Sequence, residues 1–372
     1  MRLISRNQWY DLDVLKVTSP LAQKGQHHLG SGKTTSFDIA HRAGVSQATV
    51  SRALRNSPLV SPETREKVQR IARELNYQVD RSAAGLRSQT SQTLALLLFE
   101  DPTTDDSQIN PFFLSMLSNI SRAANQRKFD LLVSFQQLSE DWHYEYEVSN
   151  RADGIILLGY GDYVTFTDKL AKLLSEDAHF VIWGAMQPGI EGHAVGCDNV
   201  QGGQLATEHL LAIGRRRIAF LGDITDRCPE LKQRYEGYRE ALSAAGLDTD
   251  PALQTDAQGP ETSGYEATQR LLDSGVTFDA IFAASDLIAM GAMRCLRKAG
   301  LNVPEDVSVV GFDDIHAASY VSPALTTVRQ DTAEAADVLV DKLLRMIDGK
   351  EVNSRLLPPT LVVRGSCGGR KD

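Results

Sequence analysis

Seven apolar runs of strand length, separated by amphipathic segments, are the most constraining feature of the sequence beyond residue 92. Continuous apolar strands that alternate with helices are typical of parallel sheets covered on both faces. Seven strands in roughly 280 residues exceed what one small domain usually holds, so the sequence predicts two α/β lobes. The runs span 93–99, 130–135, 154–158, 180–183, 217–221, 280–284 and 307–312.

The segment 36–79 has a different, purely helical pattern. A first helix is expected near 37–42, and Gly44 can adopt the positive φ of a tight turn that ends it. Ser46 is expected to cap a second helix, and Ser61 followed by Pro62 marks the start of a third. The sequence therefore predicts an all-α, three-helix unit ahead of the α/β lobes.

Charge is unevenly distributed between these two parts. The whole chain carries a formal net charge of -9, which by itself argues against a nucleic-acid binder. Residues 36–90, however, hold nine Lys and Arg against five Asp and Glu, whereas residues 91–372 hold 25 against 41. A basic head on an acidic body remains compatible with DNA binding.

The second predicted helix has small and polar residues at its start, as suits a helix that enters a major groove. We expect Gln47 and Ala48 to read base edges, by amide hydrogen bonds and by contact with a thymine methyl group. Further contacts to phosphates and bases are expected from Ser46, Thr49, Ser51 and Arg52. On pattern alone the alternative is a plain helical hairpin with a solvated basic face.

The segments "DIAHRAGVSQATVSRAL", "VSPETREKVQRIARELNY" and "RSAAGL" resemble the head of the LacI family of bacterial repressors, and the resemblance runs from about Thr35 to Gly365. It implies a helix-turn-helix head at 36–79 and a hinge helix at 80–91. In the hinge, Leu86 would wedge into the minor groove, and Ala83 and Ala84 would allow close packing of paired hinge helices, unless the segment is only an Ala-rich linker. The family usually has proline before the hinge, which this chain lacks. The remaining candidate DNA contacts are Ser36, Asn56 and Tyr77.

For the body, the resemblance implies a two-lobe domain like the sugar-binding periplasmic receptors, in which the chain crosses between the lobes three times. The expected lobes are 92–196 with 331–355, and 197–329 with 356–366. Residues 1–35 are expected to be an unstructured leader and 367–372 a tail. The short stretch between the second and third strands leaves room for only a small helix.

Ligands of open parallel sheets bind beyond the carboxyl ends of the strands, and several polar and aromatic residues fall there. Arg234 matches the family arginine that reaches ligand hydroxyls, and Asp286 and Asp313 match cleft acceptors. Phe112 and Trp183 would offer apolar faces to a sugar ring, and Gln330 lies at the last crossover. Each has a structural alternative: Asp286 as a helix cap, Asp313 as a turn former, and the aromatics as core.

The function expected from these features is a homodimeric repressor of carbohydrate-utilisation genes. It would bind a pseudo-palindromic operator and be released by a small sugar, although a minority of the family uses a corepressor such as a purine. The first rival, a transport receptor, is disfavoured by the head and by a start without a signal peptide.

An enzyme is the second rival, but the sequence contains no nucleophile elbow, HExxH, Walker or dinucleotide motif. Four dispersed cysteines form no CxxC pair and suggest neither a metal nor a disulfide framework. We therefore expect a cytoplasmic protein with no cofactor and no membrane span.

Overall fold

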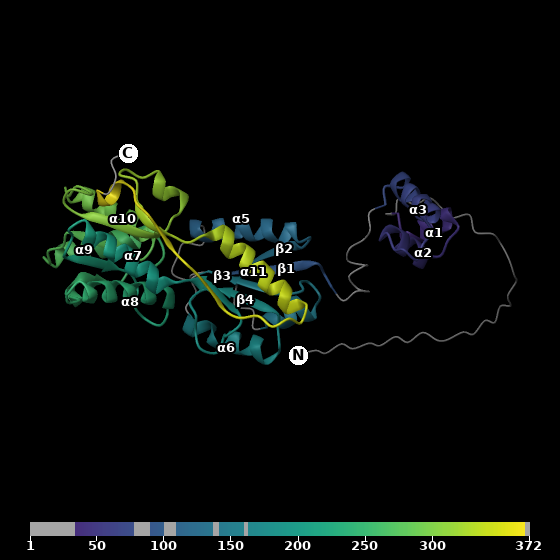
Figure 1. The fold of residues 1–372 in the computed structure, drawn as a ribbon, viewed down its shortest axis with the longest axis horizontal. Helices are drawn as coiled ribbons and strands as arrows, with labels where there is room; N and C mark the ends of the chain where they lie inside the picture. The colour runs from purple at the N-terminus through teal and green to yellow at the C-terminus, as the bar shows by residue number, and fades with distance from the viewer. Residues whose placement is uncertain (1–33, 78–89, 100–108, 137–140, 160–162, 369–372) are drawn as a thin grey trace, which may run out of the picture. The chain divides into compact units, whose positions relative to one another are not determined.

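The computed structural model describes residues 34–77, 90–99, 109–136, 141–159 and 163–368 of the 372-residue chain. The chain divides into two compact units, one ending at Asp80 and the other beginning at Arg81. We call them the head and the body, and both appear in Figure 1.

The head consists of three helices, α1 (Ser36–Ala43), α2 (Gln47–Leu54) and α3 (Pro62–Glu74). The predicted caps are confirmed. The Ser46 side chain accepts a hydrogen bond from Thr49 N, the Ser61 side chain accepts one from Thr64 N, and Gly44 ends α1 with a φ of 67°. These side chains satisfy amide groups that a helix start leaves without partners.

The head begins two residues earlier than we expected. Thr35 is the N-cap of α1, and its backbone N–H donates to the Asp38 carboxylate at 2.8 Å. The Thr34 hydroxyl donates to Leu75 O at 3.2 Å, which ties the start of the unit to the end of α3. Residues 34 and 35 therefore belong to the head and not to the leader.

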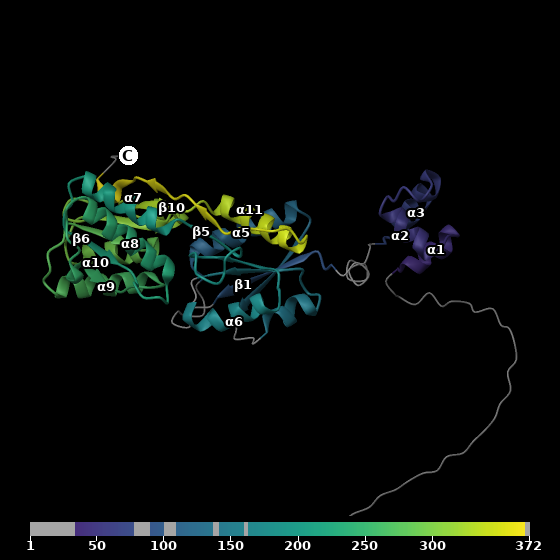
Figure 2. The ribbon, with the colours of Figure 1, turned by 60° about the horizontal axis from the view of Figure 1, so that its bottom comes forward.

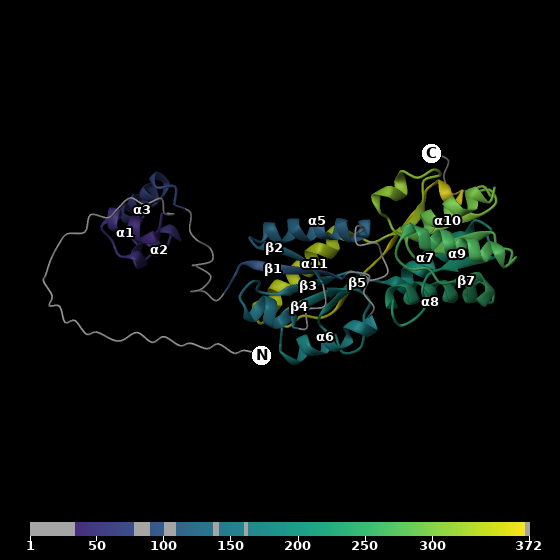
Figure 3. The same cartoon turned by 180° about the vertical axis from the view of Figure 1, so that it is seen from behind.

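The first lobe of the body is built around a six-stranded sheet in the order β11-β5-β4-β3-β1-β2, and every pairing is parallel. Figures 1 and 3, from opposite sides, show α5 and α11 together on one face and α6 on the other. Alternate residues of β1 enter the cores on these two faces, as Leu96 and Leu97 illustrate. The elements are β1 (Thr93–Phe99), α5 (Pro111–Gln126), β2 (Asp130–Gln136), a π-helix (Tyr144–Val148), β3 (Ile155–Leu158), α6 (Tyr163–Ser175), β4 (Phe180–Trp183), β5 (Ala194–Cys197), α11 (Thr332–Ile347) and β11 (Arg355–Leu357).

The second lobe contains another six-stranded sheet, in the order β12-β10-β9-β8-β6-β7. Helix α7 packs against α8, and α9 packs against α10. The elements are α7 (Asn199–Ala212), β6 (Ile218–Leu221), α8 (Pro229–Ala244), β7 (Gln254–Thr255), α9 (Glu261–Asp273), β8 (Ala280–Ala283), α10 (Asp286–Lys298), β9 (Ser308–Asp313), β10 (Thr326–Arg329) and β12 (Thr360–Val362), with 3-10 turns at Pro251–Leu253, His316–Ser319 and Gly365–Cys367.

All seven predicted strands are present, and the described residues contain five that we did not predict: β5, β7, β10, β11 and β12. These strands have two to four residues each, which is too short to give a distinct apolar run. The seven predicted strands pair in parallel as expected, whereas β12 pairs antiparallel with β10.

The chain crosses between the lobes three times: between β5 and α7, between β10 and α11, and between β11 and β12. The last crossing is the yellow segment after α11 in Figure 2. Our lobe boundaries were slightly misplaced, since Cys197 and Leu357 pair with each other within the first sheet. We had assigned both residues to the second lobe.

The segment between β2 and β3 and the C-terminal end of the body were also predicted from the sequence. In the described part of the stretch between β2 and β3, residues 141–154, the structure has one short helical segment, which includes the π-helix at Tyr144–Val148. The expected tail at 367–372 was wrong at its start, because Cys367 is buried in the last 3-10 turn. None of the described helices is long and apolar enough to cross a membrane.

Candidate functional site

One face of α2 is directed into the core of the head and the opposite face is exposed. Val50 and Ala53 are fully buried against α1 and α3, whereas Ala48 and Arg52 are exposed. The residues predicted to read bases therefore include an exposed methyl group and an exposed cation on one short helix. A helix with this arrangement can enter a major groove with its N-terminal turn foremost.

The polar side chains at the start of α2 are bonded to one another in this structure. Gln47 Nε2 donates to Ser36 Oγ at 2.8 Å, which joins the starts of α1 and α2. The hydroxyls of Ser46 and Thr49 lie 2.9 Å apart, and Ser51 Oγ accepts from Arg55 at 2.8 Å. These bonds hold the side chains in place, and a nucleic acid that contacts them would have to replace some of the bonds.

The other residues predicted to contact DNA differ in their backbone conformation, hydrogen bonding and burial. Asn56 lies in the left-handed region with a φ of 57°, and its side-chain oxygen accepts a hydrogen bond from Gln69 at 2.7 Å. Tyr77 is half-buried against the head core. Ala83 and Leu86 lie outside the described residues.

In the body, Arg234 on α8 is the largest side chain that is fully buried. Its Nε donates to Asn199 Oδ1 at 2.9 Å, and its Nη1 donates to Ala284 O. The guanidinium carbon lies 3.7 Å from the centre of the Phe312 ring. A buried cation is stable only when its donors are satisfied, so this set of partners fixes the guanidinium in one position.

Asp313 and Gln330 complete the group around this arginine. Arg234 Nη1 lies 3.6 Å from Asp313 Oδ1, and that oxygen accepts a hydrogen bond from Gln330 Nε2 at 2.7 Å. Asp313 ends β9 with a φ of 113°, a conformation that costs energy for any residue except glycine. Such strain often accompanies functional sites. The structure thus brings together three of the predicted effector residues, and we call Arg234, Asp313, Gln330 and Asn199 the guanidinium cluster.

Asp286, the fourth predicted polar residue, is fully buried at the first position of α10. One of its oxygens accepts from the Thr327 hydroxyl and the other from Ile315 N at 2.8 Å. Burial, followed by the charge of Asp313, raises the pKa of Asp286 well above its usual value. Both oxygens therefore brace α10 against neighbouring segments, and the helix cap is Ser285.

The two predicted aromatics, Phe112 and Trp183, lie near each other in the first lobe. Their ring centres are 6.2 Å apart, and each side chain is almost fully buried in the main hydrophobic cluster of the body. Their apolar faces are thus covered by protein atoms in this conformation. Contact with a ligand would require a movement of neighbouring groups.

Sequence reasoning missed Asn199 and Glu230. Asn199 directly follows the first crossing between the lobes, and its Nδ2 also donates to Cys197 O at 3.2 Å. Glu230 lies one helical turn before Arg234 on α8 and is almost fully buried. The i, i+4 spacing from Arg234 is the signal that could have indicated Glu230, because residues so spaced share a helix face.

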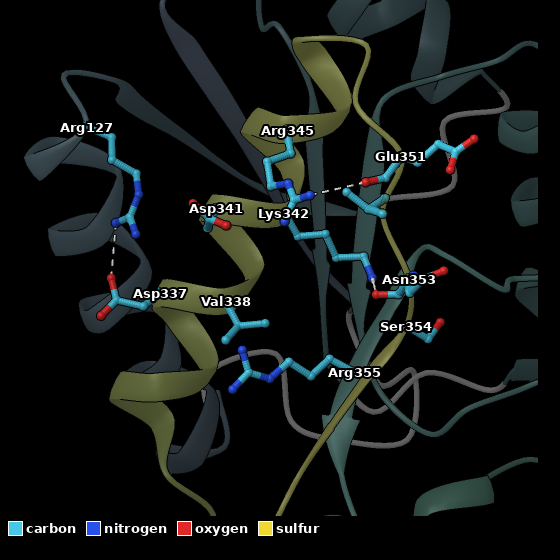
Figure 4. Close-up of a pocket in the computed structure, with 11 residues that line it drawn as sticks. Arg127, Asp337, Val338, Asp341, Lys342, Arg345, Glu351, Asn353, Ser354 and Arg355 are labelled. Atoms are coloured by element: carbon cyan, nitrogen blue, oxygen red, sulfur yellow. Dashed lines mark hydrogen bonds and ion pairs between the residues drawn. The ribbon is translucent and has the colours of Figure 1, made fainter.

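A cavity of about 500 Å³ lies elsewhere, along α11 in the first lobe (Figure 4). Its charged groups connect neighbouring parts of that lobe: Arg127 pairs with Asp337 at 3.0 Å, and buried Lys342 donates to Asn353 O at 2.6 Å. The volume is that of a ligand pocket. The lining, however, contains none of the predicted effector residues.

The chemistry of the guanidinium cluster is that of binding. Burial raises the pKa of the nearby Cys197 thiol to about 12, so this thiol is neutral at physiological pH and a poor nucleophile. Among the described residues, no group of His, Cys, Asp and Glu is arranged to hold a metal ion.

Comparison with known proteins gives consistent results for both units. The model of bacterial regulatory proteins of the lacI family matches residues 37–80, and that of a periplasmic binding protein-like domain matches 207–367. The HTH-type transcriptional regulator CelR of Thermobifida fusca is 35% identical over 314 residues, which cover 82% of this chain and 90% of CelR.

Solved structures of similar proteins cover both units of the chain. The complex of the regulator CelR with cellobiose aligns with a TM-score of 0.67 and 33% identity over 90% of this chain and 100% of that one. The lac repressor dimer bound to its operator and the anti-inducer ONPF aligns with a TM-score of 0.78 and 27% identity, over 90% of this chain and 99% of that one.

Proposed function

The chain belongs to the LacI family of bacterial regulatory proteins and is a DNA-binding transcriptional regulator, and we propose that it represses carbohydrate-utilisation genes until a small sugar releases it. A DNA-reading helix and a buried hydrogen-bonding cluster occur on one chain, and this combination carries the proposal. The similar CelR structure contains cellobiose, which supports a sugar as the effector.

The guanidinium cluster supports an uncharged, hydroxyl-rich ligand. Arg234 supplies forked donors and Gln330 an amide donor, while Asp313 and Asn199 supply acceptor oxygens. A sugar hydroxyl can donate one hydrogen bond and accept others, so it can replace several of these contacts at once. Because the groups are buried, a ligand that leaves one of them unpaired loses affinity, which gives selectivity.

The head supports sequence-specific binding through α2. We infer that Gln47 and Ala48 read bases and that Ser46, Thr49, Ser51 and Arg52 share base and phosphate contacts, with Ser36, Asn56 and Tyr77 positioning the head. Ala83 and Leu86 are assigned to a hinge helix in the minor groove. The similar lac repressor binds its operator as a dimer, which supports one head per half-site of a pseudo-palindrome.

Effector and operator affinities are then coupled, and each changes the other by the same factor. We infer no enzymatic activity, because the buried polar groups form a binding cluster and the similar proteins are regulators. Since its target is chromosomal DNA, we place the protein in the cytoplasm.

The test is fluorescence anisotropy with labelled DNA from upstream of the protein's own gene, in the presence and absence of cellobiose, ribose and purines. Salt-sensitive binding that one sugar reverses is the expected result. Binding strengthened by a purine would show corepression instead. Failure to prefer this DNA over random DNA at any salt concentration would contradict the assigned operator function.

Two variants separate the two sites. Exchanging Gln47 and Ala48 should change operator preference without changing sugar affinity. Arg234→Ala should abolish release by the sugar while operator binding persists, and Arg239→Ala, an exposed arginine on the same helix, should behave as wild type. An Arg234→Ala protein that still responds to the sugar would remove Arg234 from the effector site.

A further inference from the structure

Glu230 is a buried carboxylate that joins the two lobes of the body. It lies in the first turn of α8 in the second lobe, and only 4% of its surface is exposed. Its Oε1 accepts a hydrogen bond of 2.9 Å from Ala185 N in the first lobe. Ala185, itself fully buried, follows β4, the strand that ends in Trp183.

The first-lobe side of this contact is rigid. Gly184 N donates to Val195 O at 3.0 Å, which ties the turn to the neighbouring strand β5. A Cβ atom on Gly196 would come within 2.0 Å of Gly184 O, so the turn lies directly on that strand with no room for adjustment. A hydrogen bond to Ala185 therefore fixes α8 relative to the whole first sheet and not to a mobile loop.

The second-lobe side of the contact leads directly to the guanidinium cluster. Glu230 and Arg234 are four residues apart and share one face of α8. The carboxylate contacts the first lobe, and the guanidinium contacts Asn199, Ala284 and Asp313. One turn of helix thus carries both an acceptor and a donor, each of which can form hydrogen bonds with a hydroxyl group.

The charge of the Glu230 carboxylate determines which ligand groups can bind next to it. The N-terminus of α8 and the Ala185 N–H both stabilise negative charge on the carboxylate. A phosphate or carboxylate group on a ligand would meet the charge of Glu230 in a site shielded from water, where repulsion is strong. A neutral hydroxyl would instead donate to it.

We propose that Glu230 is a specificity-determining residue of the body, which closes the two lobes through Ala185 and restricts the site to uncharged, hydroxyl-bearing ligands. The closing role depends only on the observed contact. The selective role rests on the proposed function, since it requires a sugar at the guanidinium cluster.

The closing role is tested without any ligand, by measuring hydrogen exchange of the Ala185 amide in the full-length protein. Glu230→Ala should accelerate this exchange at least tenfold, since the amide loses its acceptor. Glu230→Gln retains an acceptor oxygen and should keep the protection. Glu240→Gln removes an exposed carboxylate from the same helix and should change nothing. Equal exchange in wild type and Glu230→Ala would overturn the closing role.

The selective role is tested by calorimetry with two matched pairs of probes, ribose with ribose 5-phosphate and cellobiose with cellobionate. Wild type should favour the neutral member of the pair that it binds, and Glu230→Gln should reduce that preference at least tenfold. An unchanged preference in Glu230→Gln, or a wild type that prefers the anion, would overturn the selective role. Absence of binding by all four probes would overturn the sugar proposal and with it the selective role, while the exchange measurement would still decide the closing role.

Discussion

Gly203→Ala should weaken the contacts between α7 and α8 that position Arg234. Gly203 is at the crossing of α7 and α8, and a Cβ atom there would come within 2.1 Å of Arg234 O. Ordinary contact begins at 3.4 Å, so the helices must separate by about 1.3 Å. Asn199 is on α7 and its partner Arg234 is on α8, so the same movement stretches their 2.9 Å hydrogen bond beyond bonding distance.

The expected magnitudes follow from these contacts. Overpacking costs about 1–3 kcal/mol, and replacing glycine by alanine inside a helix returns up to about 1 kcal/mol. The net loss is therefore up to about 2 kcal/mol, which corresponds to a fall in Tm of up to roughly 5 °C for a domain of this size. Loss of a buried hydrogen bond to a charged group costs about 1.5–3 kcal/mol, which predicts a roughly ten- to hundredfold weaker affinity for the releasing sugar.

Gly264→Ala is the matched control. A Cβ atom on Gly264 would also lie 2.1 Å from a backbone oxygen, that of Ile288, but at the crossing of α9 and α10. Its Tm, measured by calorimetry, should fall by a similar amount, while sugar affinity, measured by titration, should stay within about twofold of wild type. If Gly203→Ala lost stability but bound the sugar as tightly as Gly264→Ala, the α7–α8 crossing would not position Arg234 for the ligand.

Three further predictions concern stability. Ile39→Ala removes a fully buried side chain from the head and should cost about 2–5 kcal/mol, so operator binding should fail while calorimetry still shows sugar binding by the body. Burial lowers the pKa of Lys342 to about 8 from 10.5. Between these values the unfolded chain binds the proton more readily, so stability against urea should rise with pH, and Lys342→Met should remove this rise. The hydrogen bond that the His179 ring donates to the Glu147 carboxylate raises the pKa of His179 above 6.5, so protonated His179 stabilises the fold below that pH and the contribution disappears as pH rises through the raised value. His179→Gln should therefore flatten the decline of Tm between pH 5.5 and 8, and an unaltered decline would show that another group causes it.

The sequence predicted the long strands and the helix caps because both have local causes. A strand such as β1, whose five central residues are buried between two helix layers, must be apolar over those residues, and a cap such as Ser46 acts on a residue three positions away. Strand β10 has no such local cause. Its Thr326 and Thr327 are polar, and their burial depends on Ser366 and Asp286, which lie about 40 residues away.

The functional site likewise contains residues that the sequence predicts and residues whose roles depend on distant parts of the chain. Arg234 and Asp313 were predicted from family resemblance and Gln330 from its place at the last crossover. The structure brings these three together, but Asp286 shows what the pattern leaves open. An aspartate at the carboxyl end of a strand can bind a ligand or brace a helix, and only the positions of Thr327 and Ile315 N distinguish these roles. The i, i+4 spacing places Glu230 on the helix face of Arg234, but its partner lies in the other lobe, so the sequence does not reveal what Glu230 contacts.

The guanidinium cluster lies at two of the three crossings between the lobes. Asn199 follows the crossing after β5, and Gln330 lies in the crossing between β10 and α11. Arg234 holds the first of these residues directly and the second through Asp313. A ligand that takes hydrogen bonds from Arg234 must therefore release groups on the segments about which the lobes would rotate. Ligand binding can therefore change the orientation of the lobes directly at the segments that join them. Coupling between the two parts of the body then needs no long chain of intermediate contacts.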